Sequence, residues 1–206
     1  MTMFITLLPE IIIFLGGCFL LILGLFIKKI KIINNASIVL IVVVLILILF
    51  QPVQSILENS FIVDEFSQVF KIMILLGSLS CLIMFNSSNE DLHINIYEFP
   101  ILILFASIGM MIMVSSNDLL SMFVGLELQS LSLYVLASFK RENEKSTEAG
   151  LKYFVLSALA TGILLYGCSL IYGYTGSTNF ETISLKLNQN NTGAIFGIVF
   201  VIVGLA

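Results

Sequence analysis

Long apolar runs alternate with short polar breaks along the whole chain. Six of these runs hold 17 to 24 residues, and about 20 helical residues cross a hydrocarbon core of ~30 Å. The pattern predicts an all-α membrane protein, a polytopic helical bundle with about six complete spans and the start of a seventh. The predicted spans are residues 4–27, 32–50, 66–85, 99–115, 119–139 and 151–172, with an incomplete span at 193–206.

The composition supports this interpretation and excludes a soluble globular domain. Hydrophobic residues make up 59% of the chain and charged residues 11%, against about 45–50% and about 25% in soluble domains. The first run, Met1 to Ile27, has no early Lys or Arg and is too long for a signal peptide. We therefore treat residues 1–206 as one membrane domain whose first span is retained in the lipid bilayer.

The polar connections predict how the helices are ordered and oriented. The connection at 116–118 is very short, so the fourth and fifth helices are expected to be antiparallel neighbours. Basic residues in short loops favour the cytoplasmic or matrix side. The first-to-second connection holds Lys28, Lys29 and Lys31, and the fifth-to-sixth connection holds Lys140, Arg141 and Lys145. The loops on the other side hold only Lys186.

The last apolar run is too short to cross a membrane. Its 14 residues cover ~21 Å at ~1.5 Å per residue, less than the ~30 Å required. We expect either a fragment of a longer polypeptide or a second chain that supplies the remainder.

Several classes of chemistry have no visible basis in the sequence. The net charge is −4 with no basic block, so nucleic acid is not an expected partner. Cys18, Cys81 and Cys168 are scattered within apolar runs, and His93 has no ligand set around it, so neither a disulfide framework nor a metal site is predicted. We expect no cofactor in this chain.

Glu127 is the most informative ionisable residue, because it lies about 12 residues from the basic end of its span, or ~18 Å by the helical rise. An acid at that depth faces a cavity or a partner and predicts a functional site. Ser130 and Tyr134 share its helical face, and a second polar stripe on the opposite face indicates a helix enclosed by protein. That stripe comprises Gly125, Gln129 and Ser132. The alternative is a protonated glutamate that only fixes helix packing.

Three other ionisable residues lie within predicted spans. Lys152 lies one or two residues into the sixth span. It either snorkels to the interface or has less freedom to reach water, because the following turns of its own helix are rich in small residues and suit close packing against neighbouring helices. Lys71 lies about one turn into the third span with no evident partner, and is interpreted as reaching the interface by snorkelling. Glu10 follows Pro9 near the start of the first span, where a helix N-terminus favours an acid.

Two stretches carry a resemblance to a known family. DLLSMFVGLELQSLSLY at 118–134 and EAGLKYFVLSALA at 148–160, together with LLPE at 7–10, resemble subunit 2 of NADH:ubiquinone oxidoreductase, respiratory complex I. The resemblance implies an antiporter-like, proton-pumping subunit with inverted helix repeats. In that family a glutamate on the fifth helix and lysines on later helices form the proton path, and Glu127 and Lys152 match the first two positions. The next lysine of the family follows a motif like Gly204-Leu205-Ala206.

The same resemblance implies where the chain works and with what. It predicts other membrane-arm subunits as partners, and redox chemistry in those partners rather than in this chain. Lysine outnumbers arginine eight to one and Trp is absent, a bias typical of AT-rich organelle genomes. This favours the mitochondrial inner membrane, with a bacterial plasma membrane as the alternative. The competing functions are a subunit of a multisubunit cation/proton antiporter and a purely structural membrane subunit.

Overall fold

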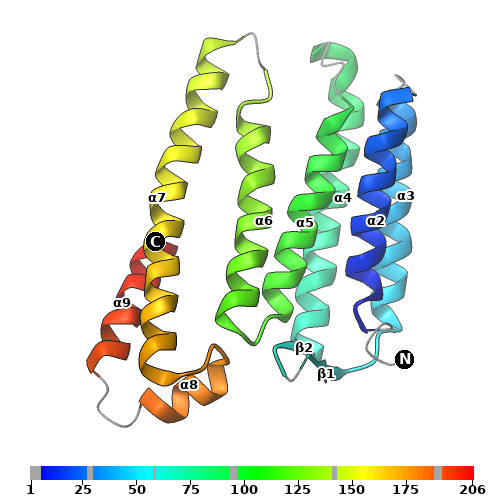
Figure 1. The fold of residues 1–206 in the computed structure, drawn as a ribbon. Helices are drawn as coiled ribbons and strands as arrows, with labels where there is room; N and C mark the ends of the chain where they lie inside the picture. The colour runs from blue at the N-terminus through cyan, green and yellow to red at the C-terminus, as the bar shows by residue number, and fades with distance from the viewer. Residues whose placement is uncertain (1–5, 27–29, 58, 93–96, 141–142, 188–191) are drawn as a thin grey trace.

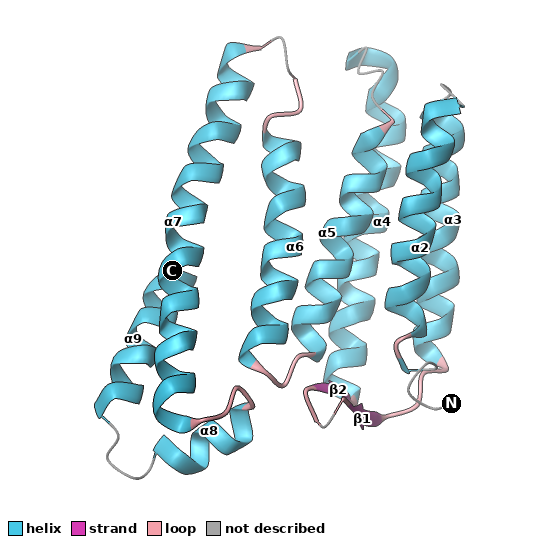
Figure 2. Cartoon of the chain, viewed as in Figure 1, coloured by secondary structure: helices cyan, strands magenta, loops and turns pink. Residues whose placement is uncertain are grey.

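A computed structural model describes residues 6–26, 30–57, 59–92, 97–140, 143–187 and 192–206, and within 86–92 its backbone only. The described residues form helices and one two-stranded hairpin, joined by turns and loops (Figures 1 and 2). The helices are α2 (Leu8–Phe26), α3 (Ile30–Leu49), α4 (Glu65–Leu92), α5 (Glu98–Ser115), α6 (Leu119–Ala137), α7 (Glu144–Thr175), α8 (Phe180–Leu187) and α9 (Thr192–Leu205). The strands are β1 (Gln54–Ile56) and β2 (Phe61–Val63), which pair antiparallel.

Six described helices are long and apolar enough to cross a membrane, namely α2 to α7, and α9 is a shorter apolar helix. The predicted all-α membrane class is therefore confirmed. Two helices extend beyond the apolar runs that predicted them: α4 continues to Leu92, and α7 begins at Glu144 rather than at 151. Neither the hairpin nor α8 was predicted, because both lie in the polar connections.

The helices form two packed groups. Helices α2 and α4 both pack against α3 and α5, which makes a four-helix bundle, and α6 joins this bundle through α5. Helix α7 packs mainly against α9 and also contacts α6 (Figure 1). The bundle core is aliphatic and fully buried at Ile13, Ile41, Leu75 and Leu104, as expected for side chains that fill the space between four apolar helices.

The two ends of the structure differ in their polar residues. We call the end that carries β1, β2 and α8, at the bottom of Figure 1, the hairpin end. The opposite end, which we call the lysine end, carries Lys31 at the start of α3, Lys140 after α6 and Lys145 in the first turn of α7. The basic residues that predicted one side of the membrane are thus at one end wherever the structure describes them.

The short connection between α5 and α6 makes them antiparallel neighbours, as predicted. Asp118 caps α6 by accepting hydrogen bonds from the backbone N–H groups of Leu120 and Ser121, at 2.8 and 3.3 Å. The Thr178 hydroxyl donates to the other Asp118 oxygen at 2.5 Å. The same carboxylate therefore starts α6 and ties the α5–α6 turn to the segment that follows α7.

Candidate functional site

Glu127 lies near the middle of α6, eight residues after Leu119 and ten before Ala137. The side chain is half-buried, and its Oε1 atom is buried without a hydrogen-bond partner among the described residues. An unpartnered buried carboxylate oxygen is costly and rare in a purely structural position. This oxygen is the feature that distinguishes Glu127 from the other acids of the apolar helices in the α6–α7 region.

The orientation of Glu127 is set by a close crossing of α5 and α6. A Cβ atom built on Gly125 would lie 2.8 Å from the Gly109 carbonyl oxygen, and one built on Gly109 would lie 2.5 Å from the Gln129 backbone nitrogen. Gly125 and Gln129 therefore face α5. Glu127 is two residues from each, about 200° around the helix, so its side chain points away from α5.

The face of Glu127 is shared between α7 and an exposed apolar stripe. Tyr134, two turns along the same face, donates a hydrogen bond to the Ser157 hydroxyl of α7 and packs edge-on against Tyr153. The stripe beside Glu127 consists of Leu120, Val124, Leu131 and Val135. The structure places α5 and α7 on two sides of α6, as the prediction of a helix enclosed by protein requires, and it leaves this stripe exposed among the described residues.

Lys152 is exposed on α7, near the lysine end. Its Nζ atom forms an ion pair with Oε1 of Glu148, one turn earlier, at 2.6 Å, and its side chain is 67% exposed. The Tyr134–Ser157 hydrogen bond fixes the register of the two helices. From that register, Lys152 and Glu127 are separated by roughly 18 Å along the helix axes at ~1.5 Å per residue. The structure does not bring these two predicted site residues into contact.

The structure also contains a buried ion pair that the sequence analysis did not predict. Oε1 of Glu10 in α2 lies 2.6 Å from Nζ of Lys71 in α4, with side-chain exposures of 6% and 0%. The ammonium group also lies 5.1 Å from the ring centre of Phe61 in β2, within cation–π range. The interpretation of Lys71 as a snorkelling residue is wrong, because the hairpin and the bundle enclose it and Glu10 neutralises it.

A signal for this pair was present in the sequence. Glu10 and Lys71 have opposite charges, and both lie within two turns of the start of a span that begins on the same side. Two buried charges at a similar depth are expected to pair. The apolar spacing of the chain gave no information on which helices are neighbours, so the pairing could not be assigned.

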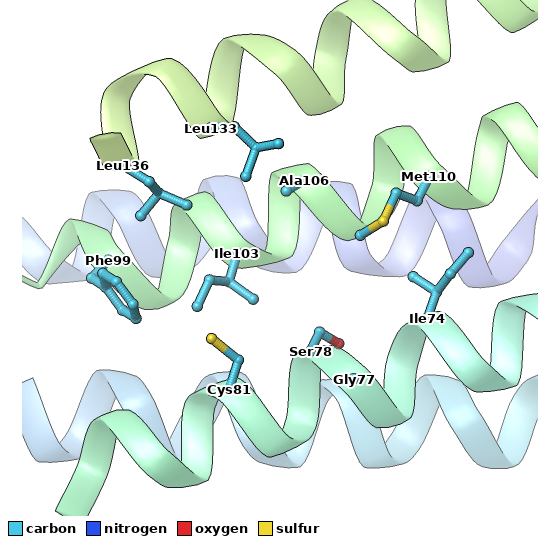
Figure 3. A pocket seen from close by; sticks show the side chains of 10 residues that line it. All are labelled: Ile74, Gly77, Ser78, Cys81, Phe99, Ile103, Ala106, Met110, Leu133 and Leu136. Carbon is cyan, nitrogen blue, oxygen red and sulfur yellow. The ribbon is translucent and has the colours of Figure 1, made fainter. Parts of the chain in front are cut away.

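A cavity of about 360 Å³ lies between α4, α5 and α6 (Figure 3). Figure 3 shows Ile103 and Met110 of α5 together with Leu133 of α6 around it. The Ser78 hydroxyl in its wall already donates to the Leu75 carbonyl oxygen at 2.9 Å. This apolar cavity therefore offers few groups that could conduct a proton between α4 and α6. Its lining residues are Ile74, Gly77, Ser78, Cys81, Phe99, Ile103, Ala106, Met110, Leu133 and Leu136.

Within the described segments, no three His, Cys, Asp or Glu side chains are grouped so that they could hold a metal ion. Cys18, Cys81 and Cys168 are free thiols. The predicted loop residue His93 lies outside the described residues.

Comparisons with known proteins point to one family. Residues 116–206 match the family described as NADH:quinone oxidoreductase/Mrp antiporter, transmembrane. The chain is 48% identical over 203 residues to NADH-quinone oxidoreductase subunit N of Pelagibacter ubique, a match that covers 97% of this chain and 43% of that protein. The chain therefore spans less than half the length of this curated relative.

Solved structures agree with the sequence comparison. A chain in respiratory complex I from Thermus thermophilus with bound aureothin superposes with a TM-score of 0.74 at 30% identity, covering 96% of this chain and 43% of that chain. A chain of the Mrp complex from Dietzia sp. DQ12-45-1b gives a TM-score of 0.71 at 20% identity, covering 100% of this chain and 40% of that chain. The latter similarity concerns the fold alone.

Proposed function

Because the chain belongs to the antiporter-like membrane subunits of NADH:quinone oxidoreductase and represents part of their length, we propose that it takes part in proton translocation. Translocation is driven by NADH oxidation and quinone reduction in partner subunits. The observation that carries the proposal is the buried, unpartnered Oε1 of Glu127 near the middle of α6. A carboxylate in this environment binds and releases a proton without disturbing a hydrogen-bond network that holds the fold.

Hydroxyl groups extend from Glu127 toward the lysine end. Ser130 lies one turn from Glu127 on α6, and the Tyr134 hydroxyl, one turn further, is bonded to the Ser157 hydroxyl of α7. Hydroxyl groups both donate and accept hydrogen bonds, so they can pass a proton along an ordered chain that includes water. The exposed Lys152–Glu148 ion pair lies on α7 between Ser157 and the lysine end, two residues on either side of Gly150, which faces α6, so both side chains point away from α6. We propose that Glu127 exchanges protons with the lysine end along the α6–α7 interface.

Glu127→Gln in the assembled complex is expected to reduce proton pumping to a minor fraction of the parent rate. Glutamine keeps the shape and polarity of the side chain but cannot carry the proton. Pumping is measured as acidification coupled to NADH oxidation in membrane vesicles, normalised to the amount of assembled complex. Glu181→Gln, an exposed acid on α8, is the matched control and should pump like the parent. Normal pumping by Glu127→Gln would refute the proposal, and loss of assembly would indicate a purely structural role.

Lys152→Met is expected to lower pumping while the complex still assembles, because it removes a positive charge from the part of α7 between Ser157 and the lysine end. The side chain is exposed in this chain, so its removal costs little stability. Lys145→Met, at the same end of α7 and also exposed, serves as the control for a general loss of basic charge. Parent-like pumping of Lys152→Met would leave Lys152 as an interfacial side chain that takes no part in the relay.

We further propose that the redox centres are held by the partner subunits and that this chain binds no flavin, cluster or metal. The separate positions of the three free cysteines support this. We propose other membrane-arm subunits as the partners. The part of the curated relatives that this chain does not cover is supplied either by a continuation of the same polypeptide or by a second chain. The bacterial origin of these relatives favours a bacterial plasma membrane over the mitochondrial inner membrane predicted from the lysine bias.

A second candidate function is that of a cation/proton antiporter subunit, which the fold similarity to the Mrp complex favours. Both functions use the same Glu127 carboxylate. The two functions differ in the partner subunits that purify with the chain. Flavin and iron–sulfur absorbance in the purified intact complex supports the oxidoreductase. Sodium-dependent proton release by a complex without these chromophores supports the antiporter.

A further inference from the structure

The cavity in Figure 3 is a groove along the side of α5, with α4 and α6 as its walls. Both of these helices pack against α5, and Ile103 and Ala106 of α5 form a buried floor. Gly77 and Cys81 of α4 line the same space, yet both are exposed. A Cβ atom built on Gly77 would have no other atom within 4 Å. The groove is therefore open on its outer side, along α4.

The long axis of the groove follows α5, which runs from the lysine end to the hairpin end (Figure 1). Phe99 lines the groove near the start of this helix and Met110 lines it further along, a separation of ~16 Å by the helical rise. The hydrocarbon core of a bilayer is ~30 Å thick. The groove thus extends from the lysine-end surface of the membrane to about its middle, the depth that the acyl chains of one leaflet occupy.

The lining of the groove is suited to a hydrocarbon ligand. Apart from Ser78 and Cys81 it is formed by aliphatic and aromatic side chains, Met110 and Gly77, and the Ser78 hydroxyl already donates to the Leu75 carbonyl oxygen at 2.9 Å. None of the lining side chains has a buried oxygen or nitrogen atom without a partner. Apolar cavities do not hold water, and the solvent outside a membrane-spanning helix is hydrocarbon.

The volume of the groove fits a narrow occupant. A helix ~10 Å in diameter and ~16 Å long occupies on the order of 1,300 Å³, whereas the cavity measures about 360 Å³. A partner helix could place only side chains in the groove. A single extended hydrocarbon chain is far thinner, and it can contact the floor and both walls at carbon–carbon distances of ~4 Å.

The lysine end of the groove carries aromatic rings and two charged side chains. The ring of Phe99 stacks on Phe85 and packs edge-on against Phe139, with centroid distances of 4.2 and 5.4 Å. Glu98, which is half-buried, precedes Phe99, and Lys140, which is exposed, follows Phe139. A base and an acid beside one opening complement the phosphate and the ammonium of a zwitterionic phospholipid headgroup, because charge-assisted hydrogen bonds form with both.

We propose that this groove binds one acyl chain of a zwitterionic phospholipid, of the phosphatidylethanolamine type, from the leaflet at the lysine end. The phosphate lies near Lys140 and the ammonium near Glu98, and the chain extends along α5 as far as Met110. The bound chain packs against α4, α5 and α6 together. The lipid therefore joins the four-helix bundle to the helix that carries Glu127.

Photo-crosslinking of the assembled complex tests the proposal independently of proton pumping. The complex is reconstituted in phosphatidylethanolamine vesicles that contain a small share of phosphatidylethanolamine with a photoactivatable group in one acyl chain, and the labelled residues are located by mass spectrometry. Label is expected at Cys81 and Met110 in excess of Leu76, an exposed residue of α4 that does not line the groove. Equal labelling of Leu76 and Cys81 would indicate bulk lipid only, and protection of Cys81 by a partner subunit would indicate a docked helix; either result overturns the proposal.

Two variants of the same complex sharpen this test. Gly77→Phe places a ring in the groove and should remove the label from Met110, whereas Leu76→Phe adds a ring outside the groove and should be labelled like the parent. Lys140→Gln should lower the labelling of Met110 by about fivefold, the effect of losing one lysine contact with a lipid surface. Parent-like labelling of Met110 in assembled Gly77→Phe would contradict acyl-chain binding. If Gly77→Phe does not assemble, the comparison of Cys81 with Leu76 in the parent decides the matter.

Discussion

Gly109→Val is expected to force α5 away from α6 and to prevent the chain from reaching a stable fold. A Cβ atom at Gly109 would lie 2.5 Å from the Gln129 backbone nitrogen and 2.6 Å from the Gly125 carbonyl oxygen. Both contacts are with backbone atoms, which cannot move aside by a change of rotamer. Over-packing costs about 1–3 kcal/mol where side chains can adjust, so here we expect a larger loss, comparable to much of the stability of a domain.

The measurement is the amount of folded chain in detergent and its thermal unfolding midpoint. Gly77→Ala is the matched control, because nothing lies within 4 Å of a Cβ atom built at Gly77, which borders the cavity in Figure 3. Alanine should be tolerated there and should favour the helix by about 1 kcal/mol. A Gly109→Val chain that unfolds at the parent temperature would contradict the close crossing of α5 and α6.

The Gly109–Gly125 crossing also explains why the face of Glu127 could be predicted from sequence. The helical period places Gly125 and Gln129 opposite Glu127, and the structure assigns the glycine side to α5. Close approach of two helices requires small residues, and in membranes such residues commonly mark the contact. The polar pattern alone could not show that the remaining side of α6 is divided between α7 and an exposed stripe, because that depends on which helices are neighbours.

The hydropathy pattern predicted the spans because the bilayer restricts the backbone conformations that a segment can adopt. Every backbone group inside it must be satisfied within the segment, which requires a helix. The polar connections are not under this constraint. The hairpin is held by the pairing of β1 with β2 and by a contact distant in sequence, in which the Asn117 N–H donates to the Ser60 carbonyl oxygen at 2.9 Å. Helix α8 has only eight residues, too few to produce a periodic signal.

The environment of Lys71 could not be predicted from the depth of this residue in its span alone. The sequence places it about one turn into a span, where a lysine ordinarily reaches water along its own helix. The segment before α4 returns as a hairpin and covers that route with Phe61. Once water is excluded, the nearest opposite charge, Glu10, determines the conformation of Lys71. The residue that was expected to be peripheral is consequently among the most deeply buried side chains of the structure.

Lys71→Met alone is expected to destabilise the bundle strongly, because it leaves the Glu10 carboxylate buried without its partner. Breaking a buried ion pair by removing one member costs about 3–5 kcal/mol, and total stabilities are about 5–15 kcal/mol. The chain should therefore accumulate poorly in the membrane, and the remaining folded protein should unfold at a lower temperature in detergent. Glu10→Gln alone leaves the ammonium unpaired and should have a similar effect.

The double variant Glu10→Gln/Lys71→Met supplies the control for this loss. Replacing both members of a buried ion pair by neutral groups of similar volume is often neutral or stabilising, so the double variant should be more stable than either single variant. The difference, measured as a double-mutant cycle, gives the coupling between the two side chains. If the effects of the single variants simply add, the groups do not interact, and the 2.6 Å contact would have no energetic consequence. Strong coupling means that α2 and α4, which pack through α3 and α5, are also joined directly by charge across the bundle.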